Sequence, residues 1–582
     1  MKHIIYIPVF MLLCCGFGCS ENVVDARTGG KNANKEEDGN KPDNPSSISY
    51  SQAVTPPTIP SVDESDYSAY YVDNVSGDDK NDGRSENAPF KTFEPILDLV
   101  RTGMSPKTKV LLRSGCTFTE NLVLKNLNGT MTKPFILDSY GGVERPTISA
   151  PGGDAVLIQD DNMRFRNIRI TNKTGSRGIC IQAQFKGKGA FRNVEITGCR
   201  IEEVNWAGNA NVEGTDPANL DVEAIAPGAK FSTKEFGGII LEPAANSAMQ
   251  EPYWYENIFI TNNEIRKVCR SGILITGKWG SREPGQGLNK YDNDSGSWYP
   301  NRNIVVQGND FNYIGGDAVI MMSTTDSYID HNRCFNANFL GRNGQASAGL
   351  WPYSSANIVM QYNEVAYTRL AHGSSDGEGL DVDFACKNTL VQYNYVHHND
   401  GGGILLCNNA GGSEHSGTVI RNNVFYNNKG SYRGSLMTVS GNVNNVEVYN
   451  NIIMQTAATT NFLLSDNWPK SGKSTNVRFR NNIFLSSVPA SIAFVFNNMD
   501  NPKFENNLFY QVGSIYVNDT APLRYDPKIT PPASADGFSK VQQFRPAEAK
   551  VFQDGLLFDG MPEKDLVGNA VEGVCYVGPF AK

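Results

Sequence analysis

The chain has 582 residues, a net charge of −9 at neutral pH, 56 glycines and 10 % aromatic residues. The acidic balance argues against a non-specific nucleic-acid partner, so we expect no nucleic acid to bind. The length exceeds that of one ordinary compact domain. A repeat protein can exceed it, because its core grows in one dimension.

The N-terminus reads as an export signal followed by a linker. Residues 1–19 have a basic start and an apolar run that is too short to span a membrane, and they end in Gly-Cys. That ending resembles a bacterial lipobox, with Cys19 as the lipidated residue. Residues 20–66 are polar and should form a flexible tether. We expect an exported monomer that touches a membrane only through its lipid, at the outer membrane or cell surface; the alternatives are periplasmic and secreted protein.

A repeated nine-residue sequence pattern dominates the rest of the chain. In each copy, apolar residues alternate, an Asn takes the seventh position, and a further apolar pair follows, as in NTLVQYNYV at residues 388–396. The period of two predicts strands rather than helices. In the full-length copies, the asparagines at this seventh position are Asn263, Asn309, Asn363, Asn394, Asn423, Asn451, Asn482 and Asn507.

The spacing of these asparagines predicts a solenoid. From Asn309 onward, through Asn332 in a shortened copy, the steps are 23, 31, 31, 29, 28, 31 and 25 residues. Steps of this size are typical of stacked repeats, each of which buries its face against the next. An all-β, right-handed parallel β-helix fits, in which the asparagines stack into an amide ladder. The longest insertions, which should leave as loops, fall at residues 205–256, 277–302 and 366–377.

Both ends of the predicted solenoid resemble one known group. The stretches 75–83 and 88–92 resemble the entry motif of right-handed parallel β-helix proteins of the pectate-lyase-like superfamily, and 565–569 with 576–580 resemble its closing motif. The resemblance implies a β-helix over residues 67–535, with residues 536–582 as a closing segment packed on it. For activity it is only suggestive, because one fold hosts many functions.

One coil departs from the repeat, in the sequence DGEGLDVDF at residues 376–384. If Leu380 and Val382 face the core, Asp381 and Asp383 leave the same outer face of one strand. Two neighbouring carboxylates repel, so the pKa of one should rise, as acid-base chemistry requires. We therefore expect Asp381 and Asp383 to be catalytic. Glu378 is a further candidate, although its parity suggests a turn.

Counting back from the ladder asparagines adds candidates on neighbouring coils. Asp317 falls in line with Gly379 two coils away, a separation within the range that glycosidase carboxylates use. The remaining candidates are substrate-binding residues that lie near this face in the expected register: Trp351, Tyr353, Lys278, Trp279, His372 and His397.

Three functions are consistent with this pattern. The first is a glycoside hydrolase that degrades a polysaccharide or oligosaccharide and needs no cofactor. The second is a polysaccharide lyase with Lys278 as base, in which calcium is bound by Asp376, Glu378, Asp381 and Asp383. The third is a glycan-binding solenoid without activity, although one chemically unusual coil argues against it.

Eight cysteines follow Cys19, and none forms a Cys-x-x-Cys pair. Most occupy strand positions, which favours buried free thiols. A disulfide between neighbouring coils is the alternative.

Overall fold

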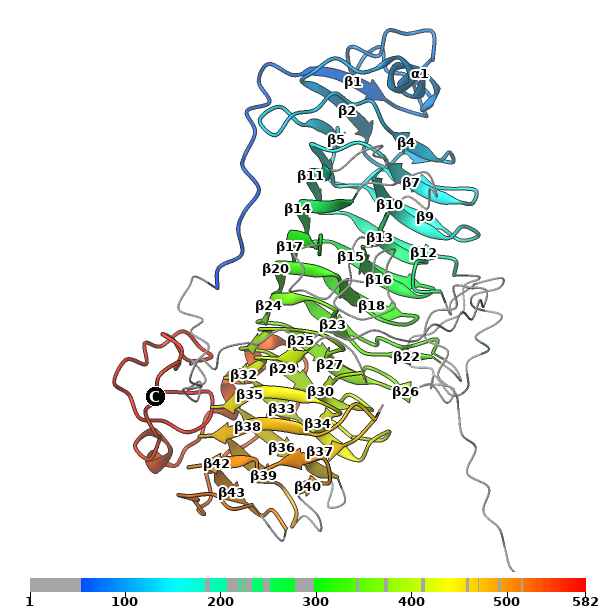
Figure 1. Cartoon of the computed structure of the whole chain (residues 1–582). Helices are drawn as coiled ribbons and strands as arrows, with labels where there is room; N and C mark the ends of the chain where they lie inside the picture. The colour runs from blue at the N-terminus through cyan, green and yellow to red at the C-terminus, as the bar shows by residue number, and fades with distance from the viewer. Residues whose placement is uncertain are drawn as a thin grey trace, which may run out of the picture.

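The computed structural model describes residues 54–183, 189–206, 219, 221, 225, 233–243, 252–277, 298–341, 345–370, 375–409, 414–456, 460–468, 470–489, 494–513 and 517–582. These residues form a parallel β-helix, in which each coil contributes one strand to each of three long sheets (Figure 1). Every strand pair assigned a register within these sheets is parallel, and each strand pairs with its counterparts one coil before and after it, as in β14 with β11 and β17. The strands read from the sequence are therefore confirmed.

Sheet A holds the strands that lead into the ladder asparagines. Its members are β1 Ser68–Val72, β2 Thr108–Arg113, β5 Phe135–Tyr140, β8 Met163–Arg166, β11 Gly189–Thr197, β14 Tyr253–Thr261, β17 Asn301–Gln307, β20 Thr324–Asp330, β24 Ala356–Gln361, β28 Leu390–Gln392, β31 His415–Ser416, β32 Val419–Arg421, β35 Val443–Tyr449, β38 Ser474–Arg480, β41 Met499–Asp500 and β42 Lys503–Glu505.

Sheet B follows the asparagines. It contains β3 Thr117–Phe118, β6 Thr147–Ser149, β9 Arg169–Asn172, β12 Arg200–Val204, β15 Glu264–Val268, β18 Asp310–Ile314, β21 Arg333–Phe335, β25 Glu364–Ala366, β29 Tyr395–His397, β33 Val424–Tyr426, β36 Ile452–Gln455, β39 Ile483–Ser486 and β43 Leu508–Tyr510.

Sheet C precedes sheet A in each coil and carries the candidate site. It contains β4 Leu122–Leu124, β7 Asp154–Ile158, β10 Arg177–Ala183, β13 Gly237–Pro243, β16 Ser271–Ile275, β19 Val319–Met322, β23 Leu350–Tyr353, β27 Glu378–Val382, β30 Gly402–Cys407, β34 Ser435–Ser440, β37 Asn461–Asp466 and β40 Phe494–Phe496. A separate pair, β22 Ala346–Ser347 and β26 Ser375–Asp376, lies just before β23 and β27.

The predicted asparagine ladder is confirmed as a buried chain of hydrogen bonds. The Asn363 amide donates to Asn394 Oδ1 (2.9 Å), and the Asn394 amide donates to Asn423 Oδ1 (3.0 Å). The same contact joins each successive pair from Asn263 to Asn507. The amides also donate to backbone carbonyls where the chain turns between sheets A and B. The ladder thus satisfies polar groups that every coil buries at this corner.

Helix α1 and two short 3₁₀ helices are the helical elements with bounds among the described residues. Helix α1, Glu94–Thr102, buries Ile96 and Val100 at the N-terminal end of the core. The 3₁₀ helices, Phe538–Phe544 and Ala549–Phe552, belong to a C-terminal segment that covers the outer face of sheet B (Figure 1). No helix among the residues the structure describes is both long and apolar enough to cross a membrane.

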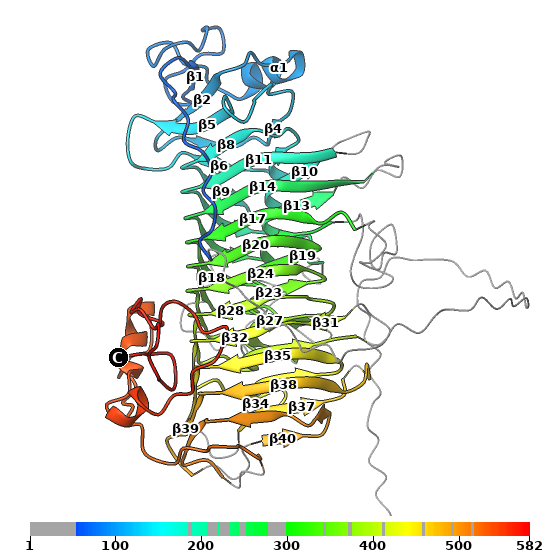
Figure 2. The ribbon, with the colours of Figure 1, turned by 60° about the vertical axis from the view of Figure 1, so that its left-hand side comes forward.

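Residues 54–67, here called the strap, extend along the outside of sheet A rather than leaving the body at β1 (Figure 2). Glu64 accepts a hydrogen bond from Arg166 at 2.9 Å, and the Gln361 amide donates to the Val54 carbonyl at 2.6 Å. The sequence places residues 54–66 in the flexible tether, whereas these contacts fasten them to the solenoid.

The signal segment and Cys19 lie outside the described residues. The eight later cysteines are free, seven of them buried, so the thiol interpretation is confirmed.

Candidate functional site

The unusual coil places four carboxylates on the outer face of sheet C. Leu380 and Val382 are fully buried in the core, so the neighbouring positions point outward, as the alternation predicts. Glu378 belongs to β27 rather than to a turn, and its side chain joins the outer group. We call the group the acidic coil: Asp376, Glu378, Asp381 and Asp383.

The members differ in exposure. Glu378 and Asp381 are 1 % and 6 % exposed, whereas Asp376 and Asp383 are half-buried. Asp376 has a positive φ of 67° and is followed by Gly377 at 81°, a pair of left-handed residues that turns the chain into β27.

Burial and mutual repulsion shift the carboxyl pKa values upward. Burial, followed by the charge of Asp383, raises the pKa of Asp381 well above its ordinary value. Burial and the charge of Asp376 raise the pKa of Glu378 to about 8. Glu378 therefore favours the protonated form at neutral pH.

The pKa of Asp383 is lower than that of Glu378, so Asp383 is the more readily ionised of the two. Burial raises its pKa to about 6, while hydrogen bonds from the Cys407 thiol and from the Phe384 backbone oppose the rise. The Cys407 Sγ lies 3.1 Å from Asp383 Oδ1, and the Phe384 N–H donates at 2.7 Å. The coil thus offers a carboxylate beside a carboxylic acid, the division of states that the paired aspartates predict.

Two cations lie at the acidic coil that the sequence did not single out. The guanidinium of Arg433 lies 3.5 Å from Asp376, 3.8 Å from Glu378 and 3.6 Å from Asp466. Arg433 reaches the coil because it lies two residues before β34, whose Ser435 follows Gly402 and Glu378 in register. Lys234 also lowers the pKa values of Asp376 and Asp383 by its charge.

Aromatic rings border the acidic coil along the solenoid. Tyr353 lies one coil before Asp383, and its ring centroid is 6.2 Å from that of Phe384, which lies 6.0 Å from the Trp468 ring. Arg433 packs over the Trp468 ring at 4.8 Å. A row of half-buried rings beside carboxylates is a surface on which sugar rings can stack.

Trp351 and Asp317 form a buried unit rather than part of an open site. Leu350 pairs with Leu380, so Trp351 aligns with Asp381 and points outward. It is 4 % exposed, with Lys234 over its ring and its Nε1 donating to Asp317 at 2.9 Å. Asp317 is fully buried and lies 2.7 Å from Arg270. Its carboxylate is therefore occupied in holding Trp351 and the adjacent backbone.

The predicted register of Asp317 was wrong by one residue. Val319 pairs with Leu350 and Leu350 with Leu380, so Asp317 aligns with Glu378 and not with Gly379. The correct alignment matches Gly379 with Gly349. A Cβ on Gly349 would lie 2.4 Å from the Gly379 carbonyl oxygen, so glycine is required where these coils meet.

Of the other candidates, His397 is described and lies away from the acidic coil. His397 belongs to β29 of sheet B, where it is fully buried between the rings of Tyr395 and Phe335 and lies 3.3 Å from Glu364. Three further candidates lie outside the described residues: Lys278, Trp279 and His372.

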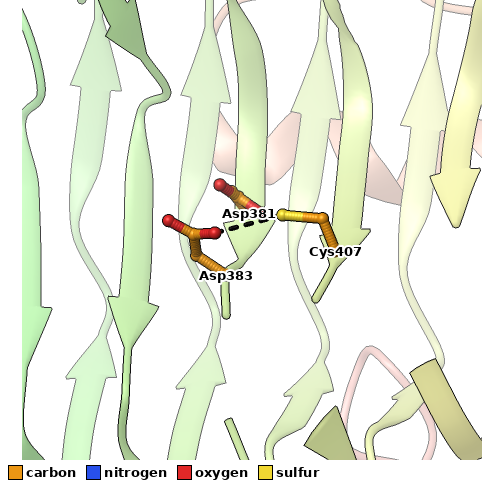
Figure 3. A group of neighbouring side chains, drawn as sticks. All are labelled: Asp381, Asp383 and Cys407. Carbon is orange, nitrogen blue, oxygen red and sulfur yellow. Dashed lines mark hydrogen bonds between the residues drawn. The ribbon is translucent and has the colours of Figure 1, made fainter. Parts of the chain in front are cut away.

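A thiol is part of the acidic coil's surroundings. Cys407 follows Asp383 by one coil, and oxygen atoms of Asp381 and Asp383 lie with its Sγ within 4.8 Å of one another. Figure 3 shows these three side chains turned toward a common point. Two of the four predicted calcium ligands, Asp376 and Glu378, already lie beside the guanidinium of Arg433. The residues present therefore fit calcium poorly.

Comparisons with known proteins agree with the fold. The family described as right handed beta helix region matches residues 237–453. A lacto-N-biosidase of Bifidobacterium longum subsp. longum is 24 % identical over 90 % of this chain, and the match spans only 37 % of that protein's length. The crystal structure of a GH136 lacto-N-biosidase from Eubacterium ramulus superposes with a TM-score of 0.50 at 20 % identity, covering 73 % of this chain and 67 % of that one. The predicted right-handed parallel β-helix is confirmed.

Proposed function

We propose that this protein is a glycoside hydrolase that acts on oligosaccharides through the acidic coil. The observation that carries the proposal is the split between adjacent carboxyl groups, with the pKa of Asp383 raised to about 6 and that of Glu378 raised to about 8. Glycosidases need one carboxylic acid and one carboxylate at the scissile bond. The similarity to a lacto-N-biosidase over most of the chain supports the same reaction class.

Exposure suggests how the roles divide. Asp376 and Asp383 are the members of the acidic coil that reach its surface, whereas Asp381 and Glu378 lie beneath them. In this proposal Asp383 is the carboxylate that attacks the anomeric carbon or activates water. Asp376, whose pKa is raised by burial against the opposing charge of Arg433, protonates the leaving oxygen. Asp381 stays protonated and orients Asp383.

This division changes the assignment based on sequence, in which Asp381 and Asp383 are the pair. The two versions can be separated with substrates of different leaving groups. Loss of a general acid harms substrates with poor leaving groups most, because p-nitrophenolate departs without protonation. Asp376→Asn should therefore retain most activity on a p-nitrophenyl glycoside and lose it on the natural oligosaccharide. If Asp381→Asn shows that pattern instead, Asp381 is the acid.

The primary test is product analysis on a panel of oligosaccharides, starting with p-nitrophenyl lacto-N-bioside. Asp383→Asn should lose about 10³-fold or more in kcat on every substrate, as expected for a group that acts in the chemical step. Asp500→Asn, an exposed aspartate at β41, is the matched control and should keep full activity. Absence of turnover on the whole panel, or full activity of the Asp383 variant, would refute the proposal.

The lyase hypothesis receives less support from the geometry. Arg433 already lies beside Asp376 and Glu378, and the pKa of Glu378 of about 8 weakens that residue as a calcium ligand at neutral pH. For the whole protein we also propose export with lipidation at Cys19 and a monomeric state. Labelling with a fatty-acid analogue, compared with Cys19→Ser, tests the lipid. Light scattering of the purified protein tests the monomer.

A further inference from the structure

The place where Asp381, Asp383 and Cys407 meet has the geometry of a small cation site. The three residues come from adjacent strands with a defined register, Asp381 pairing with Leu405 two residues before Cys407. Their potential ligand atoms lie within 4.8 Å of one another, and the three side chains converge on the outer side of sheet C (Figure 3). Ligands held on paired strands are positioned more accurately than ligands on loops.

An unpartnered oxygen points to a missing ligand at this place. The Asp381 side chain is more than nine-tenths buried, with 6 % of the residue exposed. Its Oδ1 has no hydrogen-bond partner among the described residues. A buried carboxyl oxygen without a hydrogen-bond partner costs free energy, whether or not the group is ionised. The nearby charges do not relieve it, because Asp383, Asp376 and Glu378 all act on Asp381 with the same sign and Arg433 alone is opposed.

The donor set selects the kind of cation. Calcium and magnesium prefer oxygen ligands alone, whereas a thiolate beside carboxylates suits zinc and cadmium. We propose that Asp381, Asp383 and Cys407 bind a thiophilic divalent cation such as Zn²⁺ or Cd²⁺. The ion reaches the site past Asp383, the half-buried member. On binding, the Cys407 S–H bond breaks, a metal–thiolate bond forms, and the thiol proton leaves to solvent without any redox change.

Occupancy has a direct consequence if the proposed hydrolase activity holds. An ion on Asp383 occupies the carboxylate that would attack the sugar, so Zn²⁺ should inhibit and a chelator should restore activity. The binding itself needs no substrate. Failure of the hydrolase proposal would leave the metal site standing, and failure of the metal site would leave the hydrolase proposal standing.

The test is titration of the reduced, full-length protein with Cd²⁺ and Zn²⁺. Cd²⁺ should produce one equivalent of thiolate-to-metal charge-transfer absorption, and calorimetry in two buffers should show proton release on Zn²⁺ binding. Cys407→Ala should abolish the absorption, and Asp381→Asn should weaken Zn²⁺ binding at least about tenfold. Cys334→Ala, which removes another fully buried thiol from sheet B, should bind as the unmodified protein does.

Cys407→Ser guards against loss of fold, since it keeps the size of the side chain. Its thermal unfolding should match that of the unmodified protein while Cd²⁺ absorption is lost. The proposal is overturned if no absorption appears, if binding survives in both Cys407 variants, or if Ca²⁺ binds more tightly than Zn²⁺.

Discussion

Replacing Asn394 by alanine should remove more stability than any exposed substitution, because its side chain makes five buried hydrogen bonds. Its Oδ1 accepts from the backbone and the side-chain amide of Asn363, at 3.0 and 2.9 Å. Its amide donates to Met360 O, Gln392 O and Asn423 Oδ1. Each net hydrogen bond contributes about 1 kcal/mol, and buried donors left unpaired cost more. We expect the free energy of unfolding to fall by about 3–5 kcal/mol.

Urea unfolding monitored by circular dichroism measures the change. Asn497→Ala, the same chemical change at an exposed position, is the control and should alter stability by about 0.5 kcal/mol or less. The slope of the transition should stay constant, since both variants bury the same surface. If Asn394→Ala matched the control, the ladder would be a consequence of stacking and not a cause of its stability.

Three further outcomes are expected. The pKa of Glu378 is about 8 in the folded chain and 4.5 when exposed, so the folded state binds its proton more tightly and the unfolding free energy falls as pH rises between those values. Glu378→Gln should flatten that fall in thermal melts from pH 5 to 8; an unchanged slope would contradict the shifted pKa. Chelators should not lower activity, and no product absorbing as an unsaturated sugar should form, whereas a lyase would show both effects. His397→Asn should lower the melting temperature but leave kcat/KM within about twofold, because its ring lies buried in sheet B; a large loss of kcat/KM would return His397 to the site.

The fold could be predicted because each coil solves the same local problem. A buried corner needs a donor and an acceptor at one position, and asparagine supplies both, so the residue recurs wherever the corner recurs. The same reasoning placed Asp381 and Asp383 outward, because Leu380 and Val382 had to face the core. Alternation along a single strand survives any error in the length of neighbouring loops.

Positions that depend on two coils at once were harder to predict. Asp317 was misaligned by one residue, because counting from the ladder crosses the turns between sheets C and A, whose lengths differ between coils. A better guide was present in Gly349 and Gly379, which stack directly and mark equivalent positions independently of loop length.

The two cations at the acidic coil were not predicted from the sequence, for a different reason. Arg433 and Lys234 lie in connections that carry no repeat signal; Arg433 precedes β34, two strands from β27 in sheet C, whereas Lys234 precedes β13, four strands from it. Arg433 could have been suspected from its place two residues before Ser435, which shares a register with Glu378. Nothing comparable in the sequence marks Lys234.

The strap gives the solenoid a form of cooperativity that its coils lack. In a stack of repeats each unit touches only its neighbours, so such an array can unravel from either end in steps. Here Val54 packs with Val359, Leu390 and Phe558, bringing the start of the described chain, its middle coils and the C-terminal segment into one cluster. Because this contact spans many coils, the coils between β1 and β28 should open together rather than one by one.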